Sequence, residues 1–380
     1  MSHTLHDAIS PLISDSTVLG AVAMTANRSG TLESAAVGIA DPASGASMKE
    51  DTVFQIASMT KAVTSVAAMQ LVERGLIGLD DPVGTHLPAL AEPQVLEGFA
   101  DDGSPQLRPA KSAITLRHLL THTSGLGYAF LSADMARAQG EVAPGSLASL
   151  DTPLLFDPGE KWNYGISTDW AGLLVEAVSG VSLGDYFAEH ILGPLKMDAT
   201  GFDAPKDSSK RAALQLRTPA GFAPMPVEIG GGPSAEFQSG GGGLYSTARD
   251  YLRFCRMVLN EGTLDGATIV QPATIAQMAT NQIGSLRAGR MESIIPEFAG
   301  IFDQFPAMDT KWGLGFLLLP EAGPAGRTAG SLSWAGIANS YYWIDHASDR
   351  CGVVMMQFLP FGDPAALKVF EATERAAYAV

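Results

Sequence analysis

One serine and one lysine, three residues apart, are the clearest candidates for nucleophilic chemistry in this sequence. Ser58-Met59-Thr60-Lys61 is the only S-x-x-K segment, and it falls where the β-prone run 53–56 gives way to an apolar helical segment. Residues three apart share a helical face, so the Lys61 ammonium can reach the Ser58 hydroxyl. A lysine in a dry site can lose its proton and then activate the serine as a base. An isolated S-x-x-K is more often a capping serine beside a solvated lysine, so the rest of the sequence must decide.

Further segments along the chain accompany this pair in a recognisable order. The set comprises 55–61, 114–126, 156–159 leading to Tyr164, 240–247 and 333–336. It resembles the class C β-lactamase and D-Ala-D-Ala carboxypeptidase superfamily and, within it, the family VIII carboxylesterases. The resemblance spans almost the whole chain, and its motifs are highly specific when they occur jointly. It implies a serine enzyme in which Ser58 is the nucleophile.

By this resemblance Tyr164 takes the place of the second motif, where a phenol bridges the nucleophile, the lysine and the leaving group. A phenol with an ordinary pKa near 10 becomes a usable base when a cation such as Lys61 stabilises its anion. Either Lys61 or Tyr164 could take the Ser58 proton, and the sequence leaves both open.

Two departures from the superfamily's pattern point away from a β-lactamase. Ile166 stands where the penicillin-recognising families usually have an asparagine, and Trp334 replaces the lysine of their Lys-Thr-Gly motif. The chain therefore lacks a side-chain amide for a substrate amide and a cation for a substrate carboxylate. The resemblance also implies an oxyanion hole formed by the N–H groups of Ser58 and Ile337. The expected substrate-binding residues are Tyr128, Ile166, Trp334, Ala335 and Gly336.

Other catalytic chemistries fit the sequence less well. His118 and His122 lie four apart on an expected helix, a spacing that binds zinc elsewhere, but Leu119 stands where H-E-x-x-H needs glutamate. We interpret the pair as structural and expect no metal or cofactor. No G-x-S-x-G elbow of the α/β-hydrolases occurs. The glycines at 240–243 lack the lysine and serine of a phosphate loop, so we expect them to bring backbone close to the site.

Composition limits the partners. The 380-residue chain has a net charge of −16, which opposes binding to nucleic acid or to an anionic membrane. Its two cysteines lie in apolar runs and predict no disulfide framework. No secretory signal or membrane-spanning run is evident, so we expect a cytoplasmic protein that acts on a small molecule, although a leader could have been lost. The oligomeric state is open.

The elements that must position these residues come from both ends of the chain. Short β-prone runs at 20–25 and 35–40 predict one hairpin, and those at 340–345 and 352–358 predict another, followed by a closing amphipathic helix at 364–378. Between them, 62–74 is apolar nearly all round and predicts a buried helix. The segments 116–120 and 170–179 also predict helices.

These elements predict an α/β fold in which both chain ends build one sheet and a mostly helical region is inserted. The resemblance implies the β-lactamase/transpeptidase type, with an antiparallel sheet flanked by helices. We expect a discontinuous α/β domain, residues 1–80 plus 205–380, and a mostly helical domain, residues 81–204. The active site should lie between them.

The leading hypothesis is a carboxylesterase that cleaves small, neutral, short-chain esters through an acyl-enzyme on Ser58. A β-lactamase, D-aminopeptidase or acyltransferase would use the same scaffold with another substrate or acceptor. A penicillin-binding-like protein without turnover belongs to a different class, and it would not need Ser58, Lys61 and Tyr164 together.

Overall fold

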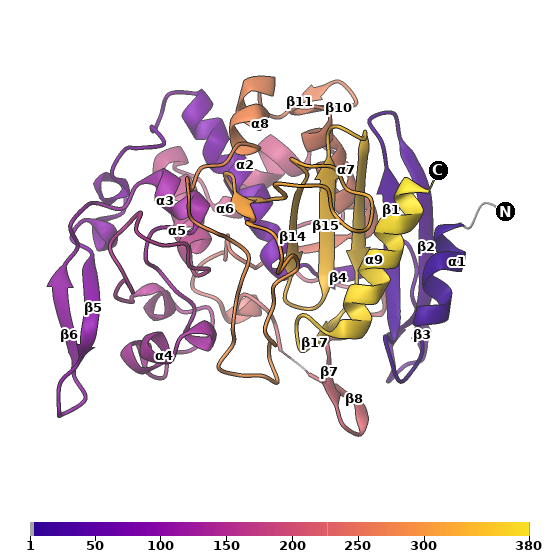
Figure 1. Cartoon of the computed structure of the whole chain (residues 1–380), viewed down its shortest axis with the longest axis horizontal. Helices are drawn as coiled ribbons and strands as arrows, with labels where there is room; N and C mark the ends of the chain where they lie inside the picture. Colours follow the sequence, from indigo (N-terminus) through magenta and orange to yellow (C-terminus); the bar gives the residue numbers. More distant parts are fainter. Residues whose placement is uncertain (1–3, 226, 380) are drawn as a thin grey trace.

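The computed structural model describes residues 4–225 and 227–379, and in that part of the chain an antiparallel sheet forms the centre (Figure 1). Both chain ends supply its strands, and every neighbouring pair within it is antiparallel. The expected fold class is confirmed. In spatial order the strands of this eight-stranded sheet are β12 (Lys311–Trp312), β13 (Leu317–Leu318), β14 (Leu332–Gly336), β15 (Ser340–Asp345), β16 (Arg350–Met355), β1 (Gly20–Ala26), β2 (Thr31–Asp41) and β3 (Ala46–Ser47).

Both predicted hairpins are present. In β1–β2 the Asn27 N–H donates to Gly30 O across the turn, and β15–β16 form the second hairpin. Because successive side chains along a strand point to opposite faces of the sheet, neighbouring residues belong to two different hydrophobic cores. Val22 and Met24 face one core, whereas Ala21 and Ala23 face the other. The strand β1 is therefore buried on both faces.

Helices cover the two faces of the sheet. The helix α7 (Ala248–Leu259) packs on β1, β15 and β16 from one side. On the other side lie α1 (Leu5–Ile9) and α9 (Pro364–Tyr378), which also pack against each other (Figure 1). The predicted closing helix at 364–378 is thus confirmed, and the two ends of the described chain meet on one face.

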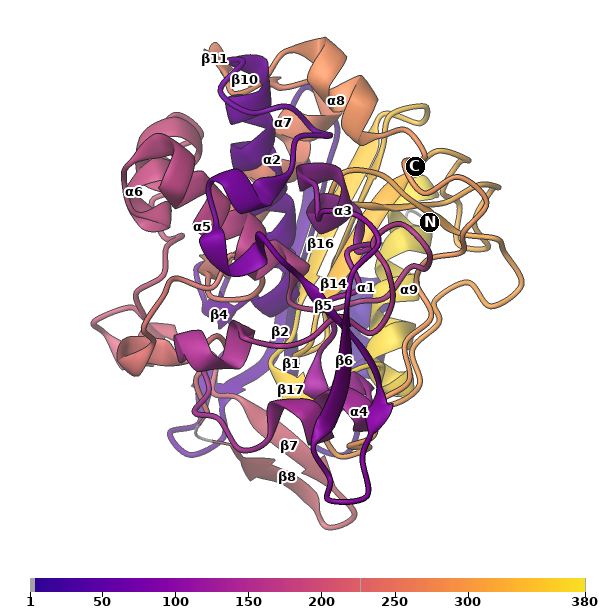
Figure 2. The same ribbon diagram turned by 90° about the vertical axis from the view of Figure 1, so that its left-hand side faces the viewer.

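The region between the sheet strands is mainly helical, as predicted. Its helices are α3 (Leu116–Thr121), α4 (Ala133–Gln139), α5 (Ser167–Ser179) and α6 (Leu183–Phe187). The hairpin β5 (Gln94–Phe99) and β6 (Pro105–Pro109) lies on its outer side, at the left of Figure 1 and toward the viewer in Figure 2. The helix α2 (Thr60–Glu73) packs against α5 and is buried along most of its length. The proposed domain boundaries at 80 and 204 stay a prediction.

Short elements complete the described chain. Paired strands are β4 (Val53–Gln55) with β9 (Tyr245–Thr247), β10 (Thr263–Leu264) with β11 (Ala267–Thr268), and β7 (Gln215–Thr218) with β8 (Gly221–Pro224) and β17 (Phe358–Leu359). The helix α8 (Pro272–Met278) follows β11. Within residues 4–225 and 227–379, none of the helices has the length and apolar character needed to cross a membrane.

Candidate active site

Ser58 lies at the junction of the sheet and the helical region. The strand β4 ends at Gln55, and Ala57–Met59 form a single 3₁₀ turn before α2 begins. This turn packs on β14 of the central sheet. Ala57 has a φ of 46°, in the left-handed region that non-glycine residues rarely occupy. The tight turn places the Ser58 hydroxyl, which is half-buried, at the amino-terminal end of the buried helix.

Lys61 folds back to Ser58, as its spacing predicted. Its Nζ donates to Ser58 Oγ at 3.3 Å, to Tyr128 OH at 2.9 Å and to Gly241 O at 2.6 Å. These three acceptors match the three donors of an ammonium group. Lys61 is only 1% exposed, so this geometry keeps it fixed beside the serine.

The surroundings of Lys61 favour its charged form. Burial alone would lower the pKa of Lys61, but the Tyr128 and Tyr164 phenols and the Asp169 carboxylate outweigh it and raise the pKa above its ordinary value. Burial in turn raises the pKa of the Tyr128 phenol, although Lys61 opposes that effect. The free site therefore holds Lys61 as a cation next to a neutral Tyr128, which argues against a neutral Lys61 as the base.

A second layer of contacts fixes the backbone that holds Lys61. Asp169, in α5, accepts from Gly241 N at 3.0 Å and from Ser239 Oγ at 2.6 Å. A Cβ at position 241 would lie 2.4 Å from Asp169 Oδ2, so only glycine fits there without displacement. The glycine-rich segment thus supplies a carbonyl to Lys61, in agreement with the expectation that it approaches the site.

Tyr164 lies just before α5 and is 5% exposed. Its loop is tied to the end of α3, since Asn163 N donates to His122 O at 2.8 Å. The Trp334 indole Nε1 donates to Tyr164 OH at 2.9 Å. Lys61 Nζ lies 4.8 Å from the centroid of the Tyr164 ring. The tryptophan that replaces the superfamily's lysine therefore still supplies a hydrogen-bond donor to this phenol.

The strand β14 brings its carboxyl end against the serine turn. A Cβ on Gly336 would lie 2.4 Å from Ile56 O, so a side chain here would push the strand away. Ile337, which follows the strand, lines the same cavities as Ser58. This close approach brings the two residues expected to form the oxyanion hole together around one space.

Two cavities meet at Ser58. The narrow cavity has a volume of about 30 Å³ and is lined by Tyr164, Met291, Phe302, Trp334, Ala335 and Phe361, among others. The wide cavity has a volume of about 550 Å³ and is lined by Tyr128, Ile166, Asp169, Leu214, Glu228 and Phe298, among others. Ser58, Phe130 and Ile337 line both. Of the predicted substrate-binding residues, Trp334 and Ala335 line the narrow cavity, and Tyr128 and Ile166 line the wide one. Gly336 lines neither cavity.

Tyr128 does more than the sequence suggested. It was expected only as a wall of the substrate pocket, and it does line the wide cavity. Its hydroxyl is also the third hydrogen-bond acceptor of Lys61. The only sequence signal for this contact is a tyrosine two residues after the Gly125-Leu126 end of the second matching segment. Ile166, two residues after Tyr164, lines the same cavity and offers no polar atom.

The charges around the two cavities disfavour anionic ligands. Among the described residues that line them, Glu228 and Asp169 are acidic and none is lysine, arginine or histidine. Arg211 lies near but is paired, since its Nη1 donates to Glu228 Oε1 at 2.8 Å. The cation next to Ser58 is Lys61, whose donors are all in use.

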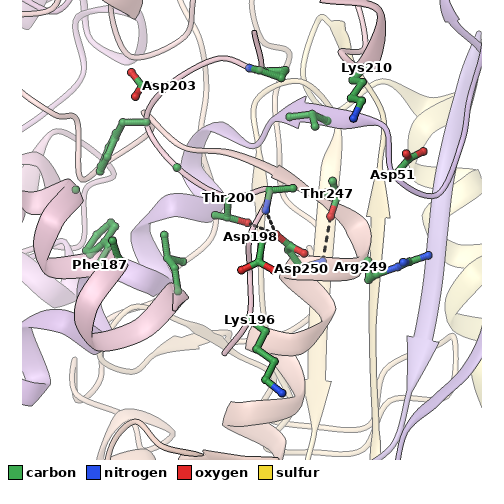
Figure 3. Close-up of a pocket in the computed structure, with 18 of the residues that line it drawn as sticks. Asp51, Phe187, Lys196, Asp198, Thr200, Asp203, Lys210, Thr247, Arg249 and Asp250 are labelled. Carbon is green, nitrogen blue, oxygen red and sulfur yellow. Dashed lines mark hydrogen bonds between the residues drawn. The ribbon is translucent and has the colours of Figure 1, made fainter. Parts of the chain in front are cut away.

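A larger cavity of about 800 Å³ lies elsewhere, between α6, the 198–205 segment and the start of α7 (Figure 3). Its lining mixes acidic and basic side chains. The most buried carboxylate there, Asp250, accepts from Ala199 N at 2.8 Å and from Thr200 Oγ1 at 2.9 Å. Its lining includes neither a serine nor the Ser58–Lys61 pair. We therefore take the Ser58 cavities as the candidate reaction site.

The expected histidine pair is split by the end of a helix. His118 lies in α3, where its Nδ1 accepts from Thr115 N at 3.2 Å in a capping box. His122 lies one residue beyond the helix with a φ of 56°, so the prediction that both share a helix was wrong. The His122 ring is buried between Trp162, Tyr164 and Trp312. The two side chains thus have separate structural surroundings.

His122 should make the fold sensitive to acid. Burial, together with the nearby Lys61 charge, lowers its pKa well below the ordinary 6.5. The unfolded chain therefore binds one more proton below pH 6.5 than the folded chain, and stability falls as the pH drops, by up to about 1.4 kcal/mol per pH unit. We expect His122→Leu to reduce this slope. Urea unfolding at about pH 7.5 and about pH 5 measures it.

The control for this experiment is His86→Gln, because His86 is exposed on the surface. The slope between the two pH values, rather than the absolute stability, is compared. An unchanged slope in His122→Leu would show that His122 becomes protonated within the folded protein.

Comparisons with known proteins agree with this geometry. The sequence profile described as Beta-lactamase matches residues 5–374. Monacolin J acid methylbutanoyltransferase of Aspergillus terreus is 33% identical over 347 residues, covering 87% of this chain and 83% of that protein. Lovastatin esterase of Penicillium rubens is 33% identical over 323 residues, covering 81% and 80%. A solved variant of simvastatin synthase from Aspergillus terreus has a TM-score of 0.84 at 30% identity, covering 99% of this chain and 96% of that one.

Proposed function

Because this chain belongs to the Beta-lactamase family, we propose that it is a serine hydrolase, a carboxylesterase of the family VIII type, that cleaves neutral esters. The observation that carries the proposal is the position of Lys61 next to an apolar cavity. Its Nζ donates to Ser58 Oγ at 3.3 Å, and its hydrogen bonds to Tyr128 OH and Gly241 O hold it there. Ser58, Lys61 and Tyr164 would act as one catalytic unit. The Ile337 N–H and the Ser58 N–H would stabilise the oxyanion.

The reaction follows from these positions in two steps. Tyr164, as a phenolate that the Lys61 cation stabilises, takes the Ser58 proton, and Ser58 Oγ forms a bond to the ester carbonyl carbon. The bond from that carbon to the alkoxide oxygen then breaks, and Tyr164 returns its proton to the leaving alcohol. Water next attacks the carbonyl carbon of the acyl-enzyme while the Tyr164 phenolate takes one of its protons; the carbon–Oγ bond then breaks, and Tyr164 gives that proton to Ser58 Oγ as the acid leaves.

Acid release from a neutral ester tests the proposal directly. We expect the protein to release acid from methyl butanoate at constant pH and to leave a chromogenic cephalosporin intact or turn it over slowly. The reason is that Trp334 and Ile166 replace the two side chains that suit a β-lactam's carboxylate and amide. Rapid cephalosporin turnover without ester hydrolysis would make the protein a β-lactamase instead.

The same chemistry predicts a charge preference. Methyl butanoate and monomethyl succinate are of similar size, but the second ends in a carboxylate. Burying an anion without a partner costs several kcal/mol, so kcat/KM should be at least about 100-fold higher for methyl butanoate. Equal values, or a preference for the succinate ester, would show that a cation such as Arg211 leaves Glu228 and binds the substrate.

Acyl transfer to an alcohol is the second candidate. The relatives include a methylbutanoyltransferase as well as an esterase, and both reactions pass through the same acyl-enzyme. They differ in whether water or an alcohol takes the acyl group. Adding an alcohol acceptor during ester cleavage and measuring new ester against free acid separates them. Ester as the main product at low acceptor concentration would favour transfer.

A further inference from the structure

The two cavities that meet at Ser58 differ in which catalytic group they contain. Tyr164 and its partner Trp334 line the narrow cavity and do not line the wide one. Tyr128 and Gly241, which accept from Lys61, line the wide cavity and not the narrow one. A tetrahedral intermediate on Ser58 whose oxyanion faces Ile337 has two other substituents. One must enter each cavity.

The position of the proton donor decides which substituent goes where. The leaving alkoxide needs a proton, and the group that supplies it must lie within hydrogen-bond reach of that oxygen. In the proposed function, on which this inference rests, that group is Tyr164. The leaving alcohol therefore enters the narrow cavity, and the acyl chain extends into the wide one.

The narrow cavity limits the alcohol. Its volume of about 30 Å³ is roughly twice the ~10–15 Å³ that one water needs. Phe302 and Phe361, whose ring centroids lie 4.5 Å apart, and Met291 form part of its wall. Phe302 is 3% exposed and Phe361 6%, so the two rings are packed in place. A methyl or ethyl group fits this space, and a longer or cyclic alcohol does not.

The wide cavity suits an apolar chain. Its volume of about 550 Å³ lies within the range of cavities that hold drug-sized ligands. Leu150, Leu214 and Ile166 line its interior, and all three are buried. Large aliphatic side chains also line it where it meets solvent: Val227, Ile294 and Ile295 are 45–47% exposed. Exposed aliphatic residues around a cavity indicate contact with apolar ligand surface.

We propose that the preferred substrates are methyl or ethyl esters of long or bulky apolar carboxylic acids, in place of the small, short-chain esters expected from the sequence. Ser58 Oγ bonds to the carbonyl carbon, the carbon–alkoxide bond breaks, and the Tyr164 proton leaves with methanol or ethanol through the narrow cavity. The attacking water enters by the same side. An acceptor alcohol would have to fit there too, so transfer is limited to alcohols as small as these.

A pair of isomeric esters tests the proposal. Methyl octanoate and heptyl acetate have the same formula, but they carry the long chain on opposite sides of the ester bond. Acid release at constant pH should give a kcat/KM about 10–100-fold higher for methyl octanoate, the range expected when apolar groups fit or miss a pocket. An equal rate, or a preference for heptyl acetate, would overturn the assignment of the cavities while leaving the esterase intact. Cleavage of neither ester would contradict the proposed function itself.

Two substitutions check the cavities separately. Met291→Ala, in the wall of the narrow cavity, should raise the rate on heptyl acetate relative to methyl octanoate. Val142→Phe, at a half-buried position of the wide cavity, should lower the rate on methyl octanoate relative to methyl acetate. Both residues are only partly buried, so the fold should tolerate the changes. The opposite pattern, with Val142→Phe acting on heptyl acetate alone, would place the alcohol in the wide cavity.

Discussion

Replacing Ser58 with alanine is expected to lower kcat/KM for methyl butanoate by at least about 10⁴-fold, because no other group in the proposed mechanism forms the bond to the carbonyl carbon. Lys61→Ala should be about as damaging. Both residues act in one unit, so the double variant should lose little more than either single variant. Initial rates of acid release, with circular dichroism to establish folding, measure the effect.

Ser65→Ala is the matched control. Ser65 is a buried serine on the same helix, and its Oγ donates to Lys61 O at 2.8 Å without taking part in the proposed chemistry. Its loss should leave most of the activity. Substantial turnover by folded Ser58→Ala would exclude Ser58 as the nucleophile.

The second large effect is expected at the phenols. Tyr164→Phe should lower kcat by roughly 10²–10⁴-fold with KM little changed, the usual contribution of a positioned proton-transfer group. Tyr128→Phe should cost less, because it removes one of the three acceptors of Lys61. A hydrogen bond to a charged group contributes about 1.5–3 kcal/mol, which corresponds to roughly 10- to 100-fold in rate. Steady-state kinetics on methyl butanoate compares the two variants.

The order of these two effects is the decisive result. If Tyr128→Phe were the more damaging change in kcat, the proton transfer would belong to Tyr128. The leaving alcohol would then lie in the wide cavity, and the assignment of the two cavities would be reversed. Near-normal kcat in Tyr164→Phe would leave Tyr164 as a structural partner of Trp334.

Local patterns in the sequence were enough to predict much of the fold. The β-prone runs 20–25 and 35–40 predicted the first hairpin, and the helix predicted at 364–378 has those bounds in the structure. The contact between Lys61 and Ser58 was predictable because it depends only on three-residue spacing along one helix. The motif order of the resemblance placed Tyr164 and Trp334 in one site, which is where the structure brings them.

Contacts between distant segments were not predictable from such patterns. Lys61 forms hydrogen bonds with Tyr128, 67 positions away in the sequence, and with Gly241, 180 positions away. No periodicity in the sequence indicates either contact. The sequence also left open whether Lys61 or Tyr164 is the base, because it does not show that the two phenols and Asp169 surround Lys61. His122 was misplaced because α3 ends at Thr121, after only six residues.

The division of the site into two cavities could not be predicted from the sequence either. Phe302 is buried, yet it also forms part of the wall of the narrow cavity, whereas Phe298 lines the wide one. Which ring faces which cavity depends on how the segment 284–310 packs on Phe130 and Phe361. The backbone groups of Phe130 and Phe361 form hydrogen bonds with that segment.

Covalent labelling of the intact protein by a fluorophosphonate tests most directly whether Ser58 is an activated nucleophile. The reagent forms a stable bond only with a serine whose hydroxyl is activated and whose neighbourhood stabilises the developing oxyanion. Peptide mass spectrometry after digestion should find stoichiometric label on Ser58, and the Ser58→Ala variant should take up none. Absence of label in the folded wild-type protein, or label on a different residue, would contradict the proposed mechanism.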